Sequence, residues 1–274
     1  MADDKVPIRA PVAVRPSFMY SPLNDSLDEF RLMSVLPYQP DTRIQIELCH
    51  ASMSHASLPG SYRCLSYTWG PPDDTQEISL GGHPFRVRRN LYEFLEQAAK
   101  SLCDEKIWVD VLCINQDDDD EKAKQIVKMG LIFHRAKEVL VWLGNDNDLF
   151  LFFEWMNSGQ GKFGNHAPGR MESTKRAFLQ HPYWNRAWIT QEILVATSIR
   201  VLYSTYSIEW TLFQKLAFLG AQTPHLFFCE WRNVHMDVNQ EEPSVCHIVT
   251  VPRNYSGEQV NTFRHGPVLV VWRS

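Results

Sequence analysis

Three segments of the sequence combine apolar runs with polar side chains at points where strands or helices are expected to end. They are residues 65–70 (LSYTWG), residues 108–116 (WVDVLCINQ) and residues 186–193 (RAWITQEI). In open α/β sheets, ligands bind at the carboxyl ends of the strands. We therefore expect these three segments to form a binding or catalytic site.

The third segment carries a carboxylate in a clear helical setting. Trp188 and Glu192 are four residues apart and so share one face of a helix. Ile189, Ile193 and Ala196 form another face, which can pack against a sheet. A helical glutamate taken alone is most often exposed or paired with a cation, so Glu192 needs further support before a catalytic role is assigned to it.

The second segment contains Asp110 inside an apolar run, and a buried carboxylate needs partners. We favour a structural role over catalysis, with Asp110 holding the loop at residues 115–116 or the end of the first segment. Asn115 and Gln116 suit a turn and a helix entry as well as they suit ligand contacts. Trp69 of the first segment suits packing better than a role as a stacking platform.

Other chemistries lack the patterns that they require. The acidic run at residues 117–121 has neither the spaced oxygens nor the glycine of a calcium loop and is typical of a helix start. The cysteines and histidines at residues 229–247 lack zinc-ligand spacing, and Cys113 has no evident base. The glycines at residues 159–164 do not form a phosphate loop. We therefore expect no metal site.

Hydrophobic periodicity predicts the elements that must position the three segments. Asn90 is expected to cap the helix that follows a tight hairpin around residues 81–82. Alternating strands and helices indicate βαβ units, and hence an open, mainly parallel α/β sheet flanked by helices, with a β-hairpin insertion. The expected strands are residues 43–49, 62–67, 77–80, 84–87, 107–114, 139–143 and 199–203, and the expected helices are residues 91–102, 122–134, 149–156, 172–180, 186–196 and 210–219.

Composition excludes several classes of protein. The 274 residues include 27 Lys and Arg against 32 Asp and Glu, so the chain has no basic excess for a nucleic-acid backbone. No apolar run reaches the roughly 18 residues of a membrane span, and the start of the chain does not resemble a secretory signal. The six cysteines contain no Cys-x-x-Cys pair, which is typical of a reducing compartment. We expect a cytoplasmic protein that binds no nucleic acid.

The three segments together resemble the signature blocks of the fungal heterokaryon incompatibility (HET) domain. Further blocks resemble that family in the same order: residues 18–23 (FMYSPL), Arg31 with Leu32, the hairpin before Asn90, and residues 141–144 (VWLG). The resemblance covers roughly residues 18–218. It is specific because several blocks agree in order and spacing rather than one short motif.

The resemblance implies a fold and a chemistry. HET domains are related to TIR domains, which have a flavodoxin-like fold, and the family acts in non-self recognition and regulated cell death, a form of innate immunity. Some TIR domains hydrolyse NAD with a glutamate in a Trp-x-x-x-Glu pattern, which residues 188–192 match. The resemblance thus implies that Glu192 is catalytic and that NAD, or a related nucleotide, is the substrate. No cofactor is expected.

This chemistry is physically coherent. Cleavage between nicotinamide and ribose passes through an oxocarbenium-like centre, which a carboxylate beneath the sugar would stabilise. Arg186 could pair with phosphate, and Gly70 allows close approach of the backbone. Nicotinamide leaves as a neutral molecule, so no metal is needed. The residues expected to bind the substrate are Ser66, Tyr67, Trp69, Gly70, Asp110, Asn115, Gln116, Arg186 and Trp188.

A second hypothesis comes from a different class of protein. The chain would be a non-catalytic TIR-like module that forms homotypic oligomers and recruits other signalling proteins. A flavodoxin-like nucleotide or flavin binder ranks last because no phosphate loop is present. For the organisation of the chain we expect a flexible leader at residues 1–16, the HET domain at residues 17–220, and an irregular, truncated C-terminal extension at residues 221–274.

Overall fold

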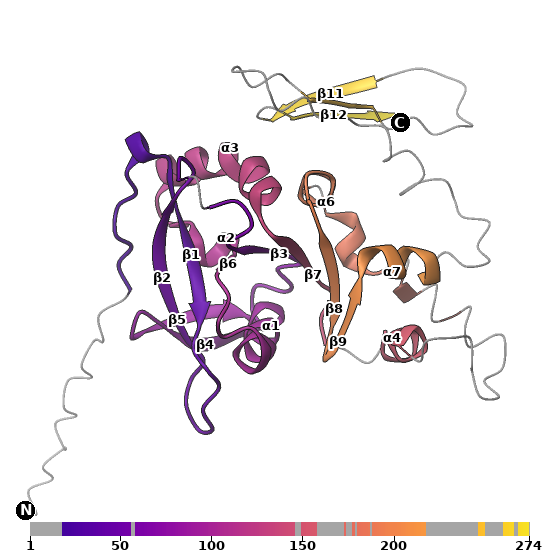
Figure 1. Cartoon of the computed structure of the whole chain (residues 1–274), viewed down its shortest axis with the longest axis horizontal. Helices are drawn as coiled ribbons and strands as arrows, with labels where there is room; N and C mark the ends of the chain where they lie inside the picture. Colours follow the sequence, from indigo (N-terminus) through magenta and orange to yellow (C-terminus); the bar gives the residue numbers. More distant parts are fainter. Residues whose placement is uncertain are drawn as a thin grey trace, which may run out of the picture.

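The structure is a computed structural model of the whole chain (Figure 1). It describes residues 18–55, 58–145, 149–157, 173, 177–178, 180–186 and 188–217, and the backbone of three strands within residues 246–273. The expected leader at residues 1–16 lies outside these residues, as does most of the helix expected at residues 172–180. Of the expected extension at residues 221–274, only the three strands are described.

Five strands come first in the chain, and helices then separate most of the following strands as far as α7. The strands are β1 (Glu29–Val35), β2 (Gln45–Ser52), β3 (Arg63–Tyr67), β4 (Thr75–Leu80), β5 (His83–Arg88), β6 (Ile107–Trp108), β7 (Glu138–Trp142), β8 (Ile199–Tyr203), β9 (Tyr206–Glu209), β10 (Cys246–Val249), β11 (Val260–His265) and β12 (Val268–Arg273). The helices are α1 (Arg89–Ser101), α2 (Asp110–Cys113), α3 (Asp119–Arg135), α4 (Phe150–Asn157), α6 (Ile189–Leu194) and α7 (Trp210–Ala217).

Nine strands form one mixed sheet in the order β5-β4-β2-β1-β6-β3-β7-β8-β9. The four strands β6, β3, β7 and β8 are parallel to one another. The pairs β1–β2, β4–β5, β8–β9 and β1–β6 are antiparallel. The pair β2–β4 is parallel, so parallel and antiparallel pairs are equally frequent in this sheet. The expectation of a mainly parallel sheet is therefore wrong, because antiparallel hairpins lie on both sides of the parallel block and β1 pairs antiparallel with β6.

Two sequence-based expectations fail where side chains bond to nearby backbone. The strand expected at residues 107–114 ends at Trp108, and the chain turns into the single helical turn α2. Asp110 accepts a hydrogen bond from the amide of Val111 at 2.7 Å, and such local bonds compete with a sheet ladder. Asn90 does not cap α1. Its side-chain amide instead donates to the Thr68 carbonyl at 2.5 Å, and its oxygen accepts from Trp142 Nε1 at 2.8 Å.

The helix start predicted from the acidic run is confirmed. The side chain of Asp118 caps α3 by accepting from the amide of Glu121 at 2.9 Å, and Asp119, Asp120 and Glu121 occupy the first turn. Carboxylates are favoured there by the helix dipole. The helix expected at residues 186–196 is shorter in the structure, where α6 covers only residues 189–194.

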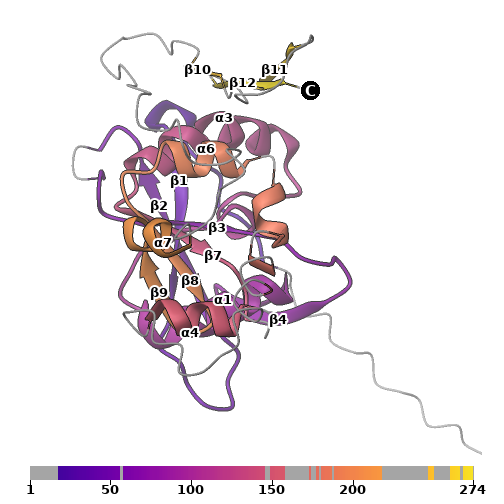
Figure 2. The ribbon, with the colours of Figure 1, turned by 90° about the vertical axis from the view of Figure 1, so that its right-hand side faces the viewer.

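Helices lie on two sides of the parallel strands. In Figures 1 and 2, α3 and α6 lie together above these strands, and α1 and α4 lie below them. A Cβ atom at Gly130 of α3 would lie 2.7 Å from Nε2 of Gln191 in α6, so the absence of a side chain at Gly130 lets the two helices approach closely. All five residues of β7 are buried. The core is thus continuous around the central parallel strands.

No helix in the described part of the chain is long and apolar enough to cross a membrane.

Candidate functional site

Glu192 of α6 lies at the centre of a buried polar cluster and is 3% exposed. Arg186 binds its carboxylate with both nitrogens, from Nη1 to Oε2 at 3.0 Å and from Nη2 to Oε1 at 2.9 Å. The hydroxyl of Ser66 donates a short hydrogen bond to the same Oε2. Bidentate contacts between a guanidinium and a carboxylate are among the strong charge-assisted hydrogen bonds. Both oxygens of Glu192 are therefore engaged.

Tyr183 closes this cluster. Its hydroxyl lies 2.6 Å from the Ser66 hydroxyl, and the guanidinium of Arg186 lies 5.5 Å from the centre of its ring. Arg186 also donates to Ser66 at 3.1 Å. Burial raises the pKa of the Tyr183 hydroxyl, and the charge of Glu192 raises it further. We call Ser66, Tyr183, Arg186 and Glu192 the buried cluster.

Local structure explains why these side chains meet. Ser66 is fully buried in β3, next to the end of that strand. Tyr183 lies in a 3-10 turn, Pro182–Asn185, where proline stands at the first position and so costs no backbone hydrogen bond. Arg186 follows this turn directly. The amide of Glu192 bonds the carbonyl of Trp188 at 3.1 Å, which orients the carboxylate from the first turn of α6.

The ion pair of Arg186 and Glu192 balances the charge of the buried cluster. Burial acts to lower the pKa of the Arg186 guanidinium, but the neighbouring Glu192 and Tyr183 raise it overall, so Arg186 remains a cation. Its side chain is 18% exposed, compared with 5% for that of Glu192. Arg186 is therefore the more accessible member of the pair.

The second segment approaches the first through Asp110. Trp69 Nε1 donates to Asp110 Oδ2 at 3.0 Å. Burial raises the pKa of the Asp110 carboxyl and the charge of Glu192 adds to this, while hydrogen bonds from Trp69 and Val111 and the charge of Arg186 oppose it. Asp110 thus lies within electrostatic range of the buried cluster, and its bond to Trp69 is of the kind that a structural role predicts.

The hydroxyl of Tyr67 is influenced by these charged groups. The residue is 3% exposed. Burial raises the pKa of its hydroxyl well above the usual range, with a further contribution from Asp110, whereas Arg186 and Arg88 act in the opposite direction. Charged residues of the second and third segments, together with Arg88, therefore act on this hydroxyl of the first segment.

Other predicted residues lie apart from the buried cluster. Gln116 donates from Nε2 to the carbonyl of Asp110 at 3.1 Å, and the Asn115 side chain accepts from the amide of Asp117 at 3.2 Å. Both side chains therefore bond to the loop backbone around α2. Trp188 begins α6 and is 39% exposed, as is Trp69. Gly70 has a φ of +76°, a conformation that glycine adopts without strain.

Two contacts near the candidate site were not predicted from the sequence: that of Arg88 with Trp69 and that of Arg31 with Glu121. Arg88 ends β5, donates to the Gly70 carbonyl at 2.8 Å, and lies 5.1 Å from the centre of the Trp69 ring. Arg31 of β1 is 2% exposed and binds both carboxylate oxygens of Glu121 at 2.6 and 2.9 Å. Neither contact has a local sequence signal, because each joins residues far apart in the chain.

The Arg31–Glu121 pair fixes the loop that follows α2. Arg31 also donates to the carbonyls of Cys113 and Ser21 at 3.1 and 2.6 Å. Glu121 Oε1 accepts from the amide of Asn115 at 2.7 Å. One buried ion pair therefore joins β1, the segment before it, α2 and α3.

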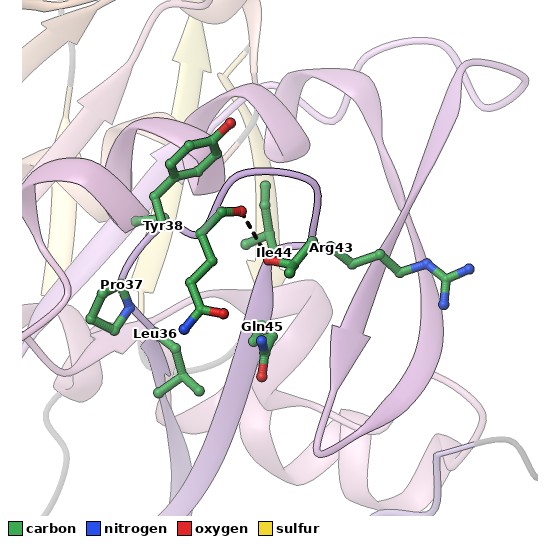
Figure 3. Close-up of a pocket in the computed structure, with 9 residues that line it drawn as sticks. Leu36, Pro37, Tyr38, Arg43, Ile44 and Gln45 are labelled. Carbon is green, nitrogen blue, oxygen red and sulfur yellow. Dashed lines mark hydrogen bonds between the residues drawn. The ribbon is translucent and has the colours of Figure 1, made fainter.

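A small hollow lies elsewhere in the fold, where the chain passes from β1 to β2 (Figure 3). Its side chains are mainly apolar or neutral, and Arg43 points away from the others drawn with it and pairs with Glu77. The lining contains no carboxylate or cysteine. It consists of residues 36–39 and 42–45 with Ala99.

No group of His, Cys, Asp and Glu suited to hold a metal ion occurs among the residues that the structure describes. The buried cluster instead offers one carboxylate, one guanidinium and two hydroxyls beside the carboxyl end of β3. Such a set can bind a polar ligand or stabilise a developing charge, provided that Arg186 releases the carboxylate.

The fold and the site together define an α/β domain with a buried ion pair beside its parallel strands. Residues 62–192 match the model of the family described as heterokaryon incompatibility protein (HET). This part of the chain is thus similar to a HET domain, and it contains every candidate site residue named above from the three segments.

A curated relative supports the assignment. The heterokaryon incompatibility protein 6, OR allele, of Neurospora crassa is 33% identical over 138 residues, which cover 44% of this chain and 20% of the relative. The chain thus aligns with about a fifth of that protein's length. No solved structure matches the chain significantly.

Proposed function

We propose that this chain acts in fungal heterokaryon incompatibility, in the cytoplasm, as part of a response that ends in cell death. The HET match over residues 62–192 and the name of the Neurospora crassa relative support this role. The finer proposal is that the domain hydrolyses NAD to nicotinamide and ADP-ribose, with Glu192 as the catalytic carboxylate.

The observation that carries the finer proposal is the meeting of the three segments. Ser66 bonds Glu192 directly, and Asp110 interacts electrostatically with both Glu192 and Arg186. The strand order of the parallel block also supports a TIR-like core. Along the chain these strands come in the order β3, β6, β7, β8, with the hairpin of β4 and β5 between the first two, and their spatial order is β6-β3-β7-β8. This second-first-third-fourth order is that of flavodoxin-like folds.

In the proposed reaction the bond between the ribose C1′ and the nicotinamide nitrogen breaks, and its electron pair leaves with neutral nicotinamide. Glu192 stabilises the cationic sugar, as carboxylates do in glycoside cleavage. Water then adds its oxygen to C1′ and releases one proton. Because Arg186 occupies Glu192 in the structure, substrate must displace the guanidinium, and Arg186 is the exposed side of the pair.

The test is nicotinamide release by the purified chain and by Glu192→Gln. The substitution removes the negative charge but keeps a hydrogen-bonding side chain, so we expect a loss of activity on the order of 100-fold. Glu138→Gln is the matched control, because Glu138 is a buried carboxylate that also pairs with arginine, from Arg63 and Arg200 at 3.2 and 2.9 Å. Equal turnover by wild type and Glu192→Gln would exclude Glu192 as the catalytic group.

A second candidate function is a non-catalytic module that self-associates or recruits signalling partners. The observation in its favour is the burial of Glu192 at 3% exposure, with both oxygens bonded. In this case the buried cluster only holds α6 against β3. Nicotinamide release measured across protein concentration separates the two: no release at any concentration, together with concentration-dependent oligomers in light scattering, favours the module.

A further inference from the structure

Arg88 is a cation without a carboxylate partner in the part of the chain that the structure describes. Its side chain is partly buried, and among the described residues its hydrogen-bond partner is the carbonyl of Gly70, which accepts from Nη1 at 2.8 Å. A guanidinium has five N–H donors in a planar fork. Arg88 therefore keeps donors that the neighbouring protein groups do not use.

Arg186, by contrast, is committed to protein groups. It gives two hydrogen bonds to Glu192 and one to Ser66. While these bonds are in place, the same donors cannot bind a phosphate, and Arg186 becomes available only when a ligand displaces it from Glu192. Arg88, by contrast, has donors available before a ligand arrives.

Arg88 stands beside the same end of β3 as the buried cluster. Its guanidinium carbon lies 5.1 Å from the centre of the Trp69 ring, and Trp69 in turn bonds Asp110. The charges of Arg88, Asp110 and Arg186 all act on the Tyr67 hydroxyl. These contacts place Arg88 and the exposed ring of Trp69 on the approach to the candidate site.

We propose that Arg88, stacked on Trp69, binds the diphosphate of a nucleoside diphosphate ligand such as ADP-ribose or NAD. This inference rests on the proposed function for the choice of ligand. A planar guanidinium suits phosphate oxygens because it can donate two parallel hydrogen bonds. Stacking on Trp69 and the bond to Gly70 hold its orientation before the ligand arrives, which reduces the conformational cost of binding.

Calorimetric titration of the full chain with ADP-ribose tests the proposal. Arg88→Met keeps a long apolar side chain against Trp69 but removes the charge, and we expect it to weaken binding of ADP-ribose by at least about tenfold, or about 1.4 kcal/mol. Arg86→Met is the matched control: Arg86 lies two residues earlier on β5, is exposed, and contacts Thr75 at 3.4 Å. It should bind ADP-ribose like wild type.

Further arms separate the charge of Arg88 from a purely structural role. Arg88→Lys keeps the cation and should retain part of the affinity, whereas equal weakening by Lys and Met would overturn the proposal. Weak binding of adenosine, which has no phosphate, should not change in Arg88→Met. Unchanged ADP-ribose affinity in Arg88→Met, or absence of ADP-ribose binding by wild type, would also overturn it.

The two proposals fail separately. Wild type that binds ADP-ribose through Arg88 but releases no nicotinamide supports the phosphate site and contradicts NAD hydrolysis. If wild type and Arg88→Met both release nicotinamide and have the same KM for NAD, the phosphate site is contradicted. The proposal of hydrolysis at Glu192 is unaffected by that result.

Discussion

Glu192 and Asp110 are carboxylates in different surroundings. Glu192 has a bidentate arginine partner and a hydroxyl donor. Asp110 has neutral donors, the Trp69 indole and the Val111 amide. An ion pair compensates a buried charge directly, whereas neutral donors compensate it in part. Asp110 is therefore the carboxylate whose buried charge is compensated only in part.

We predict that Asp110 makes the protein less stable as pH rises. Burial raises its pKa in the folded protein above the ordinary value of 3.8, so the folded state holds the proton more tightly than the unfolded state. The stabilising contribution is fully present below 3.8 and is lost as pH rises through the raised pKa. Asp110→Asn should remove this contribution.

Urea unfolding of wild type and Asp110→Asn between about pH 3 and pH 7 measures the effect. Asparagine has one acceptor oxygen instead of two, so a constant difference between the proteins is also expected. The test is the slope: the free energy of unfolding of wild type relative to the variant must fall with rising pH. A difference that is independent of pH would contradict the prediction.

At the scale of elements, α3 links the buried pair of Arg31 and Glu121 to the site. Its start is fixed by Asp118, and its middle meets α6 at Gly130. The shortness of β6 and the turn α2 depend on local bonds of Asp110 that hydrophobic patterning does not report. An apolar run can therefore predict burial correctly while it predicts the wrong element.

We predict that Asp118→Ala lowers the free energy of unfolding by about 1 kcal/mol, because it removes the side-chain acceptor for the amide of Glu121. Thermal or urea unfolding measures this loss. Asp120→Ala is the control, since Asp120 is an exposed first-turn carboxylate that interacts with the helix dipole. A loss from Asp120→Ala as large as that from Asp118→Ala would contradict the capping role.

At the scale of the whole molecule, the sheet has a protected centre and two edges. β7 is buried along its whole length and pairs with strands on both sides, whereas β5 and β9 end the sheet. The buried cluster joins β3, next to β7, to the turn before α6. The candidate site is therefore anchored on the most protected part of the fold.

Hydrogen exchange followed by mass spectrometry should show this gradient. Amides of β3 and β7 should exchange most slowly, because opening them requires unfolding of the central sheet, and amides of the edge strands β5 and β9 should exchange faster. This difference in exchange rates is expected for the intact chain at neutral pH. Exchange of β7 as fast as that of β5 would show that the parallel block is not the stable centre.

The sequence alone predicted the similarity to the HET family, the three segments of the candidate site and most of the helices and strands, because these depend on local spacing and on blocks in a fixed order. Tertiary structure decided the rest. The antiparallel pairing of β1 with β6, the hydrogen bond of Ser66 to Glu192, and the position of Arg88 against Trp69 each join residues whose separation along the chain carries no local signal. Only the packing of the sheet and its helices brings those charges together.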